Sequence, residues 1–564
     1  MRSSIIISIL ALAISYASAY PVYSDDDAST IVDHSTNSPP KEPEDQPEKV
    51  PRPNPNAPKK ITLLHTNDLH AHFDESNSGG ADCSAESKAE NKCYGGIARI
   101  KTLVDSYRSK SSNVVLLDAG DQFQGTLFFS MFGSNSSTEF MNKLKYDAME
   151  IGNHEFDRGE DYLASFLKSL NFPAISSNID LETAPKLKEA GVKPYMYLPK
   201  YSLAIIGFIT NTTADITMGG KNVKFYDPVD PVQKYVDELR SYGVKRIIGL
   251  SHNGYKTDMR VAANTYGVDL IVGGHSHSLL LNDASIKGVE GRYPTNVTNK
   301  EGKTTWVVQA HRYGDYLGHL ELEWDEEDNM LPPTGDPILM DQSIEQDPAF
   351  QKRVDELRTS FMNLTAQVLA TSTGDFSTTD CITGECAIGN LMVDCMVSSR
   401  DSSSPAIGLI NSGGLRASLL KGSISYGDVM TVLPFENQIA SFNYTGAQIK
   451  EVLENTVSMY NAQTKKLVIS VPQWSGLKFT FDSTLPVGSR VTTVTVDNKP
   501  LSSDSTYTII TSDFVASGGD NILSPTPSIS GDVLADVFAK CIKKLGTLTP
   551  ATDNRFSKIR DGKH

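Results

Sequence analysis

The chain has 564 residues, which exceeds one ordinary domain, so we expect two folded domains with tails. With 39% hydrophobic and 21% charged residues, its composition is that of a soluble globular protein. The formal net charge is -16, and the sequence has no long run of lysine or arginine. These features exclude a protein that binds nucleic acid or an anionic membrane through a broad positively charged surface. A small anionic substrate remains compatible, because bound metal cations invert the local potential.

The N-terminus is predicted to be a secretory signal peptide over residues 1–19. Arg2 precedes an apolar run from Ile5 to Ile14, and Ala17-Ser18-Ala19 supplies the small residues before a cleavage site. The run is too short to span a bilayer, and a buried helix is the alternative. The polar segment Thr552–His564 lacks the hydrophobic tail of a lipid-anchor signal. We therefore expect a protein that is secreted and has no membrane anchor.

The following segment, residues 20–59, is rich in Pro, Asp, Glu and Ser and poor in large apolar residues, so we expect an acidic, disordered leader. Over residues 60–340, short β-branched runs alternate with amphipathic segments, which predicts an α/β domain. Strands are expected at Ile61–Leu64, Val114–Leu117, Ala204–Ile209, Arg246–Leu250, Leu270–Val272 and Trp306–Gln309, with Leu317–Trp324 as the last.

A helix is predicted to connect two domains across residues 341–366. Asp347-Pro348 offers an N-cap followed by a first-turn proline, and the amphipathic pattern continues to about Thr365. Beyond it, residues 367–560 are predicted to form a second α/β domain that begins near Leu369.

Six cysteines and five N-x-S/T sequons fit the secretory route. The close pairs Cys83/Cys93 and Cys381/Cys386 are expected to form local disulfides, which leaves Cys395/Cys541 by subtraction. A thiol metal site is the alternative, but Cys381 and Cys386 lack the usual spacing and have no neighbouring histidine. The sequons, which make glycosylation an expectation, begin at Asn135, Asn211, Asn296, Asn363 and Asn443.

Five short segments share one layout, in which an apolar strand is followed by a turn with metal-ligating side chains. Because sites in α/β sheets form beyond the carboxyl ends of strands, the five turns can converge. Each turn alone has an ordinary interpretation as surface or capping residues, but five in one order favour a common site. The segments are Leu63–His70, Leu116–Gln122, Glu150–Asp157, Gly249–Asn253 and Val272–His277.

These side chains match the needs of two divalent cations that clamp a phosphoryl group and activate water. Asp68 and His70 offer a carboxylate and an imidazole from one loop, and Asp121 is the expected bridge between the ions. Asn153, His252 and His275 are expected to complete the second ion's ligands, and His277 to turn to the first ion. Mixed imidazole and carboxylate ligands favour zinc, with manganese or another divalent ion as the alternative.

The five segments resemble the calcineurin-like metallophosphoesterases, and residues 60–560 together resemble the 5'-nucleotidase/apyrase family. The resemblance implies an N-terminal four-layer α/β/β/α domain and a C-terminal α/β domain that binds the nucleoside. It implies the two ligand sets given above, although the family usually has an amide where this chain has His277. His154 and Asp157 resemble the family's catalytic dyad, in which the histidine stabilises the transferring phosphoryl group and the aspartate orients it.

The distal half contains turns suited to a nucleotide. Asn411-Ser412-Gly413-Gly414-Leu415-Arg416 follows an apolar run, and its glycines allow close approach while the guanidinium binds phosphate oxygens. Phe435 and Phe514 lie in turn-rich segments, where two aromatic rings can sandwich a purine, although a lone phenylalanine is more often a core residue. By resemblance, both match the family's base-stacking pair, Asp520 its ribose contact, Asn411 a nucleoside contact and Arg416 a phosphate-binding arginine.

One position departs from the family, because Ile382 stands where a phosphate-binding arginine is usual, directly after Cys381. The expected function is still hydrolysis of phosphate from extracellular ATP, ADP or AMP, as an apyrase or a 5'-nucleotidase. As an expected secreted member without an anchor, the chain resembles the salivary apyrases and nucleotidases of blood-feeding arthropods, and this resemblance implies inhibition of platelet aggregation. The alternatives are a non-catalytic nucleotide or receptor binder, and a hydrolase of cyclic nucleotides or nucleotide sugars.

Overall fold

The structure is a computed structural model and describes residues 52–217, 219–400, 405–435 and 437–560. The expected signal peptide and most of the expected leader lie outside the described residues. The last part of that leader is described and lies on the first domain. There the Asn54 amide donates to Ser202 Oγ at 2.7 Å, and the Tyr197 hydroxyl donates to the Arg52 carbonyl at 2.8 Å.

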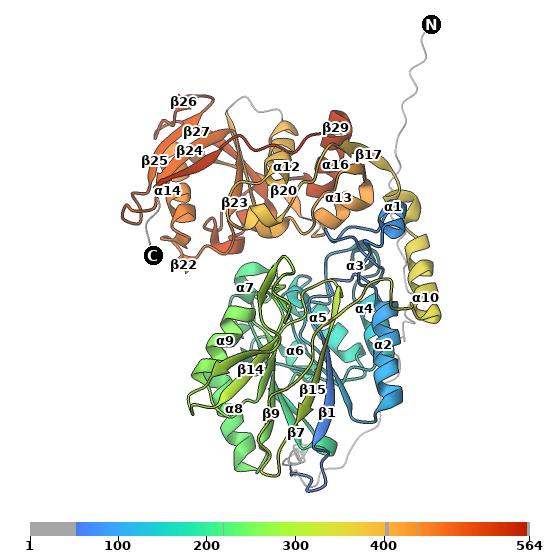
Figure 1. The fold of residues 1–564 in the computed structure, drawn as a ribbon. Helices are drawn as coiled ribbons and strands as arrows, with labels where there is room; N and C mark the ends of the chain where they lie inside the picture. The colour runs from blue at the N-terminus through green and yellow to red at the C-terminus, as the bar shows by residue number, and fades with distance from the viewer. Residues whose placement is uncertain (1–51, 218, 401–404, 436, 561–564) are drawn as a thin grey trace, which may run out of the picture. The chain divides into compact units, whose positions relative to one another are not determined.

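The first domain is built on two six-stranded sheets (Figure 1). Four neighbouring strands are parallel in each sheet, and the remaining strands pair antiparallel. The first sheet has the order β16 (Ile338–Leu339), β15 (Tyr316–Glu323), β1 (Lys60–Thr66), β2 (Val114–Asp118), β3 (Ala148–Glu150) and β4 (Ala174–Ile175). The second has the order β13 (Thr295–Thr298), β14 (Thr304–Val308), β10 (Leu270–Val272), β9 (Arg246–His252), β7 (Leu203–Ile209) and β6 (Tyr195–Leu198).

Successive side chains of the first sheet enter two different cores. Leu64 and Leu116 pack toward helices, whereas Leu63 and Val115 pack toward the second sheet. This alternation is what a strand buried on both faces requires. Helices cover both outer faces: α2 (Ile97–Lys110), α4 (Ser134–Leu144) and α5 (Glu160–Ser169) on one side, α8 (Val229–Ser241) and α9 (Tyr255–Asn264) on the other (Figure 1). The predicted four-layer α/β/β/α fold is confirmed.

Smaller elements connect these layers. They are α1 (Ala85–Ala89), α3 (Leu127–Phe132), η1 (His154–Phe156), β5 (Ile179–Asp180), α6 (Pro185–Glu189), η2 (Pro199–Tyr201), α7 (Thr213–Ile216), β8 (Lys224–Phe225), β11 (Leu279–Leu280) and β12 (Val289–Gly291). The strands expected from the sequence are all present within a few residues, but Leu317–Trp324 is not the last. The short strand β16 follows it and pairs antiparallel with β15. A strand of only two residues, Ile338–Leu339, cannot show the alternation of apolar and polar residues that predicts a strand, so the sequence contains no signal for it.

The expected connecting helix is present but broken. Helix α10 spans Pro348–Thr359 and is capped by Asp347, whose Oδ1 accepts from the Ala349 and Phe350 amides. The short helix α11 (Met362–Thr365) follows after Phe361, which turns into the core of the first domain and packs edge-on against Phe128. The amphipathic pattern continues across this break, so it predicted one helix where the structure has two.

The second domain has a central five-stranded sheet in the order β23 (Pro472–Ser475), β18 (Ala406–Asn411), β27 (Thr506–Ser512), β20 (Gln438–Thr445) and β28 (Ile529–Val533). Beside it lie a three-stranded sheet of β19 (Gly422–Ser425), β17 (Val368–Ser372) and β29 (Thr547–Leu548), and a four-stranded sheet of β26 (Lys499–Pro500), β25 (Val491–Val496), β24 (Leu477–Asp482) and β30 (Phe556–Arg560). Its helical elements are η3 (Thr379–Ile382), α12 (Ala387–Ser398), η4 (Ser412–Gly414), α13 (Tyr426–Val432), α14 (Gly446–Val457), α15 (Asp513–Ala516), η5 (Gly519–Asn521) and α16 (Leu534–Leu545), and β21 (Tyr460–Asn461) pairs with β22 (Lys466–Leu467). The predicted two-domain α/β organisation is confirmed.

All three predicted disulfides are present, as Cys83–Cys93, Cys381–Cys386 and Cys395–Cys541. The asparagines of four sequons are exposed, namely Asn135, Asn211, Asn296 and Asn443. The side chain of the fifth, Asn363, lies outside the described part. Within the described residues, no helix is both long enough and apolar enough to cross a membrane.

Candidate active site

The candidate ligand residues all lie where parallel strands of the first domain end. Asp68 and His70 follow β1, Asp121 follows β2, Asn153 follows β3, His252 ends β9, and His275 and His277 follow β10. Because the carboxyl ends of parallel strands share one edge of a sheet, the two sheets deliver these side chains to one region.

The backbone at these positions is unusual. Five of the candidate ligands are non-glycine residues with left-handed φ angles, at Asp68 (52°), His70 (46°), Asp121 (58°), His275 (74°) and His277 (55°). Residues other than glycine rarely adopt this backbone conformation, which costs about 1 kcal/mol or more at each residue. Such strain persists only where the surrounding structure enforces it, and its concentration here marks the edge as a functional site.

The side chains form two groups, each with ligand atoms within 4.8 Å of one another. In the first, His277 Nε2 lies 3.3 Å from Asp68 Oδ1 and 3.2 Å from His70 Nε2. Asp68 and His70 are buried, and His277 is half-buried. The carboxylate also accepts from the Asn67 amide and from the backbone of His275, so its position is fixed by two loops.

The second group contains Asp121, His252 and His275. His252 Nε2 lies 3.1 Å from Asp121 Oδ2 and 3.1 Å from Asn153 Oδ1, which adds an amide oxygen to the group. Asp121 Oδ2 also lies 3.7 Å from His70 Nε2 in the first group. This oxygen therefore lies between the two groups, as a bridging carboxylate must.

The side chains of both groups fit metal ions, because imidazole nitrogens and carboxylate or amide oxygens point their lone pairs at one another with no hydrogen atom between them. His70 Nδ1 lies 2.9 Å from the Phe123 carbonyl and His252 Nδ1 lies 2.6 Å from the Ala119 carbonyl, so both Nδ1 atoms donate. Each neutral ring then turns an Nε2 lone pair toward carboxylate or amide oxygens. Such facing acceptors need a positive charge between them, which a metal ion or a proton on Nε2 supplies. Although burial disfavours the charged ring, the Asp121 carboxylate raises the pKa of His252 to about 10, which expresses the same demand for positive charge.

A histidine–aspartate pair adjoins the ligand groups. His154 begins η1, and its Nδ1 lies 2.7 Å from Asp157 Oδ2 at the end of that turn. The His154 amide donates to Asp121 Oδ1 at 2.9 Å, which ties the pair to the bridging carboxylate. Burial opposes the charged ring, yet the Asp157 and Asp121 carboxylates together raise the pKa of His154 above its ordinary value.

Glu155 was not singled out from the sequence, although it organises the site. Its buried carboxylate accepts from the backbone amides of Asp121 at 2.9 Å, Gln122 at 2.7 Å, Phe123 at 3.1 Å and Gly152 at 2.6 Å. A Cβ on Gly152 would lie 2.3 Å from the Asp121 amide nitrogen, so only glycine fits between the two loops. No spacing rule distinguishes this buried support from an ordinary capping glutamate.

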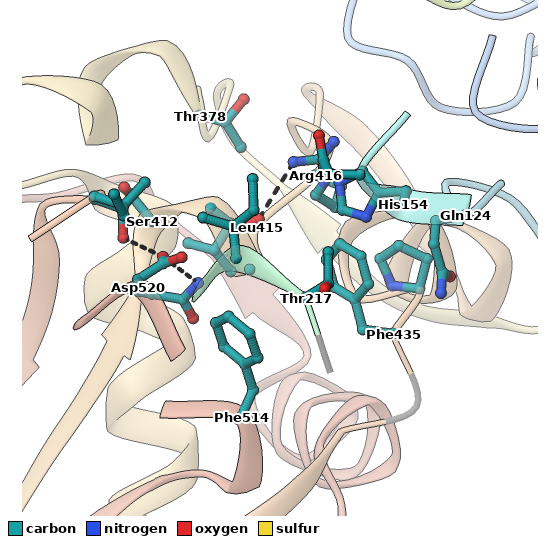
Figure 2. A pocket seen from close by; sticks show the side chains of 18 of the residues that line it. Gln124, His154, Thr217, Thr378, Ser412, Leu415, Arg416, Phe435, Phe514 and Asp520 are labelled. Atoms are coloured by element: carbon teal, nitrogen blue, oxygen red, sulfur yellow. Dashed lines mark hydrogen bonds between the residues drawn. The ribbon is translucent and has the colours of Figure 1, made fainter. Parts of the chain in front are cut away.

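The ligand groups open into a cavity of about 520 Å³ that is lined by residues of both domains. This volume is within the range of small-molecule sites. Figure 2 shows Phe514 and Asp520 at one side of the cavity, and Phe435 beside His154 and Arg416 at the other. The cavity thus brings together all five substrate residues predicted from the sequence, which are Asn411, Arg416, Phe435, Phe514 and Asp520.

One end of the cavity combines a ring with a fixed carboxylate. Asp520 Oδ2 accepts from Asn411 Nδ2 at 2.8 Å and from Ser470 Oγ at 2.6 Å, and the residue has a left-handed φ of 54°. A Cβ on Gly519 would lie 2.4 Å from the Phe514 ring, so this glycine lets the ring lie flat on the backbone. An aromatic face and a carboxylate are thereby held side by side.

At the other end, Arg416 and Phe435 meet residues of the first domain. Arg416 Nη2 lies 3.3 Å from His70 Nε2, and its guanidinium carbon lies 5.6 Å from the centre of the Phe435 ring. Phe435 stacks on His154 with 5.5 Å between ring centres. Ile382 also lines the cavity and leaves 68% of its side chain exposed, so an apolar group stands free at this wall.

Sequence profiles of two families match the chain. The calcineurin-like phosphoesterase profile matches residues 61–279, and the profile of the 5'-nucleotidase C-terminal domain matches residues 367–525. Human 5'-nucleotidase is 32% identical over 535 residues, which cover 90% of this chain and 92% of that protein. The chain belongs to the 5'-nucleotidase family. Members of this family are metal-dependent nucleotide phosphohydrolases, and the two ligand groups lie in the domain that carries that chemistry.

Other members are similar over comparable lengths. Snake venom 5'-nucleotidase of Naja atra is 32% identical over 528 residues, which cover 88% of this chain and 98% of that protein. The crystal structure of a 5'-nucleotidase precursor from Thermus thermophilus superposes with a TM-score of 0.80 at 34% identity, and covers 89% of this chain and all of that one. The likeness therefore includes both domains.

Proposed function

We propose that the protein removes phosphate from extracellular nucleotides by metal-dependent hydrolysis, with ATP and ADP or AMP as substrates. One observation supports the proposal: the same cavity is lined by members of both candidate ligand groups, by the His154–Asp157 pair, and by an aromatic and polar cluster that includes Phe514 and Asp520. A nucleotide whose phosphate lies at the ligand groups of the first domain and whose base lies at Phe514 in the second domain would span this cavity.

One divalent ion is proposed to be held by Asp68, His70, Asp121 and His277, and a second by Asp121, Asn153, His252 and His275. When bound, the two cations would polarise the phosphoryl group and lower the pKa of water. Zinc is the proposed ion, because imidazole and carboxylate ligands are mixed in both groups. His275 supports this role, since burial lowers its pKa to about 4 and keeps a lone pair available.

The dyad is proposed to act on the phosphoryl group. Asp157 accepts from His154 Nδ1, which fixes the ring and leaves Nε2 as the second donor of the charged imidazole. Its raised pKa favours that charged form near neutral pH, so Nε2 would donate to a phosphoryl oxygen as negative charge develops there. Asp157 therefore orients the ring and stabilises its charge.

The remaining predicted residues are proposed to hold the nucleotide. Arg416 would bind phosphate oxygens, because its guanidinium lies beside the first ligand group. Phe435 and Phe514 would stack on the base, and Asn411 would contact the nucleoside. Asp520 would bind a ribose hydroxyl through Oδ1, since its hydrogen bonds from Asn411 and Ser470 both go to Oδ2.

Release from the cell is part of the proposal and depends on the signal peptide predicted at residues 1–19. A secreted enzyme that consumes ADP would slow the aggregation of platelets. Adding the purified protein to ADP-stimulated platelets tests this role, with the Asp121→Asn variant as a matched control. Equal aggregation with either protein would remove the physiological proposal and leave the chemistry intact.

The chemistry is tested by phosphate release from ATP, ADP and AMP, each measured with a chelator and after metal is added back. We expect turnover that the chelator abolishes and metal restores. Comparable release from ATP and ADP with little from AMP would define an apyrase, whereas release from AMP alone would define a 5'-nucleotidase. Absence of turnover on all three by the metal-loaded protein would contradict the proposal.

A non-catalytic nucleotide or receptor binder is the second candidate, and the exposed Ile382 is the observation that favours it. An apolar side chain at this wall offers a phosphate no charge-assisted hydrogen bond. Loss of free nucleotide in proportion to protein, without release of phosphate, would identify such a binder.

A further inference from the structure

Arg312 is a second cationic side chain at the ligand groups that the sequence did not reveal. It follows β14, the parallel neighbour of β10, so its loop lies at the strand edge that carries His275 and His277. Its Nη1 lies 3.5 Å from His277 Nδ1, and its guanidinium carbon lies 4.7 Å from the centre of the Tyr313 ring. The side chain also lines the large cavity.

The surroundings of this guanidinium are unusual for a partly buried arginine. No salt bridge of the described chain involves Arg312, and its buried Nε has no hydrogen-bond partner there. A structural arginine is normally paired, because an unsatisfied buried donor costs about 1–3 kcal/mol. The four arginines with the most shielded side chains in the salt bridges of the described chain, each at most 20% exposed, all contact a carboxylate, namely Arg99, Arg246, Arg358 and Arg555.

The contact with His277 is itself incompatible with the ligand role proposed for that residue. Its Nε2 faces Asp68 Oδ1, so a metal there would take the Nε2 lone pair and leave the ring hydrogen on Nδ1. Nδ1 and Arg312 Nη1 would then be two donors facing each other. Both would need an acceptor, and an anionic oxygen placed beside them would serve both.

We propose that Arg312 is a phosphate-binding residue, which holds an oxygen of the substrate's phosphate from the His277 side of the ligand groups. This inference rests on the proposed function, because it assumes a phosphate at those groups. Arg416 approaches the His70 side, so the two guanidiniums would hold one phosphate from opposite sides of the His70–His277 pair.

Equilibrium binding tests this role without turnover. The metal-loaded wild type, Arg312→Ala and Arg312→Lys are titrated calorimetrically with inorganic phosphate and, separately, with adenosine. We expect Arg312→Ala to weaken phosphate binding by about tenfold or more, because a charge-assisted hydrogen bond is lost. Adenosine binding and metal content should not change, and Arg312→Lys should restore part of the phosphate affinity through its point charge.

Arg260→Ala is the matched control, because Arg260 pairs with Asp227 at the surface and its loss changes the net charge equally. Unchanged phosphate binding by Arg312→Ala would overturn the proposal. Equal weakening of phosphate and adenosine, or a loss of bound metal, would also overturn it and show a structural role. Failure of the proposed function is distinguishable, since it would appear as absent nucleotide hydrolysis by a wild type that still binds phosphate.

Discussion

The two walls of the cavity differ in how their functional side chains are held. The first-domain wall is made by the two ligand groups and His154: Asp121, Asn153, His154, His275 and His277 line the cavity, and Asp68, His70 and His252 contact them from within the same groups. The second-domain wall comprises Ile382, Asn411, Arg416, Phe435, Phe514 and Asp520. On the first wall most side chains are buried, and five have a strained backbone fixed by neighbouring loops. On the second wall Arg416, Phe435 and Phe514 are only half-buried, and Ile382 is exposed.

This difference agrees with the roles proposed for the two walls, which are chemistry on the first and recognition on the second. Ligand atoms must meet within tenths of an ångström, and buried loops held by groups such as the Glu155 carboxylate supply that precision. Side chains that contact a base or a phosphate tolerate more movement, so they can stand at the cavity surface. A change on the first wall should therefore reduce the rate, whereas a change on the second should mainly alter the affinity for substrate.

The largest effect is expected from Asp121→Asn, which removes the carboxylate charge between the two ligand groups. We expect phosphate release to fall by about 1,000-fold or more, because both proposed ions lose a ligand. Phosphate release and bound metal measured together would check this. Asp497→Asn is the control, since Asp497 is exposed in a left-handed turn that asparagine accepts equally well. Full activity of Asp121→Asn would show that the first wall does not hold the chemistry.

The next effect is expected from Asp157→Asn, which keeps the shape of the dyad but removes the charge that supports the imidazolium. The turnover number should fall by about 100-fold to 10,000-fold, as for loss of a positioned proton donor. Steady-state kinetics on the preferred nucleotide would separate this effect from binding. The Michaelis constant should change little, and an increase in that constant alone would place Asp157 in recognition.

On the second wall, Phe514→Ala should raise the Michaelis constant for a nucleotide by about five-fold to 150-fold, because base stacking contributes about 1–3 kcal/mol. Hydrolysis of glycerol phosphate, which has no base, is the internal control and should be unaffected. Phe514 is preferred to Phe435 here, because Phe435 also stacks on His154. Equal losses on both substrates would mean that the ring supports the fold and does not bind the base.

The smallest effect, and the only gain, is expected from Ile382→Arg. A guanidinium at this exposed position should lower the Michaelis constant by up to about tenfold, since it adds a charge-assisted contact with phosphate. Ile382→Gln supplies a similar chain without the charge and should leave the constant unchanged. Kinetics on ATP, ADP and AMP would show which phosphate the new side chain reaches, and an identical effect of both variants would contradict a role of charge.

The sequence predicted which residues gather on the first wall, but it did not predict the backbone conformation that holds them. The convergence of His70 and His252 could be predicted because strand ends followed by ligand-type residues are a local pattern, and topology alone brings such ends together. The left-handed backbone at these loops could not be predicted, because it is imposed by contacts such as the Glu155 carboxylate between distant turns. Arg312 was missed for a related reason, since it follows a predicted strand but belongs to no motif.

Elements of the fold show the same limit. The amphipathic pattern of α10 and its Asp347 cap could be predicted from the sequence. The break at Phe361 could not, because it depends on an aromatic contact with Phe128, which lies far away in the sequence. The two-residue strand β16 carries no periodicity of its own and exists because β15 offers an edge. Long-range packing decides both features, and a single sequence does not record it.

The central claim is that the strand-end loops of the first domain hold two metal ions, and anomalous diffraction from crystals of the metal-loaded protein tests it most directly. The account predicts two anomalous peaks per chain. One should lie among Asp68, His70, Asp121 and His277, and the other among Asp121, Asn153, His252 and His275, with Asp121 in contact with both. A single peak, or peaks outside these side chains in a protein that hydrolyses nucleotides, would contradict the account.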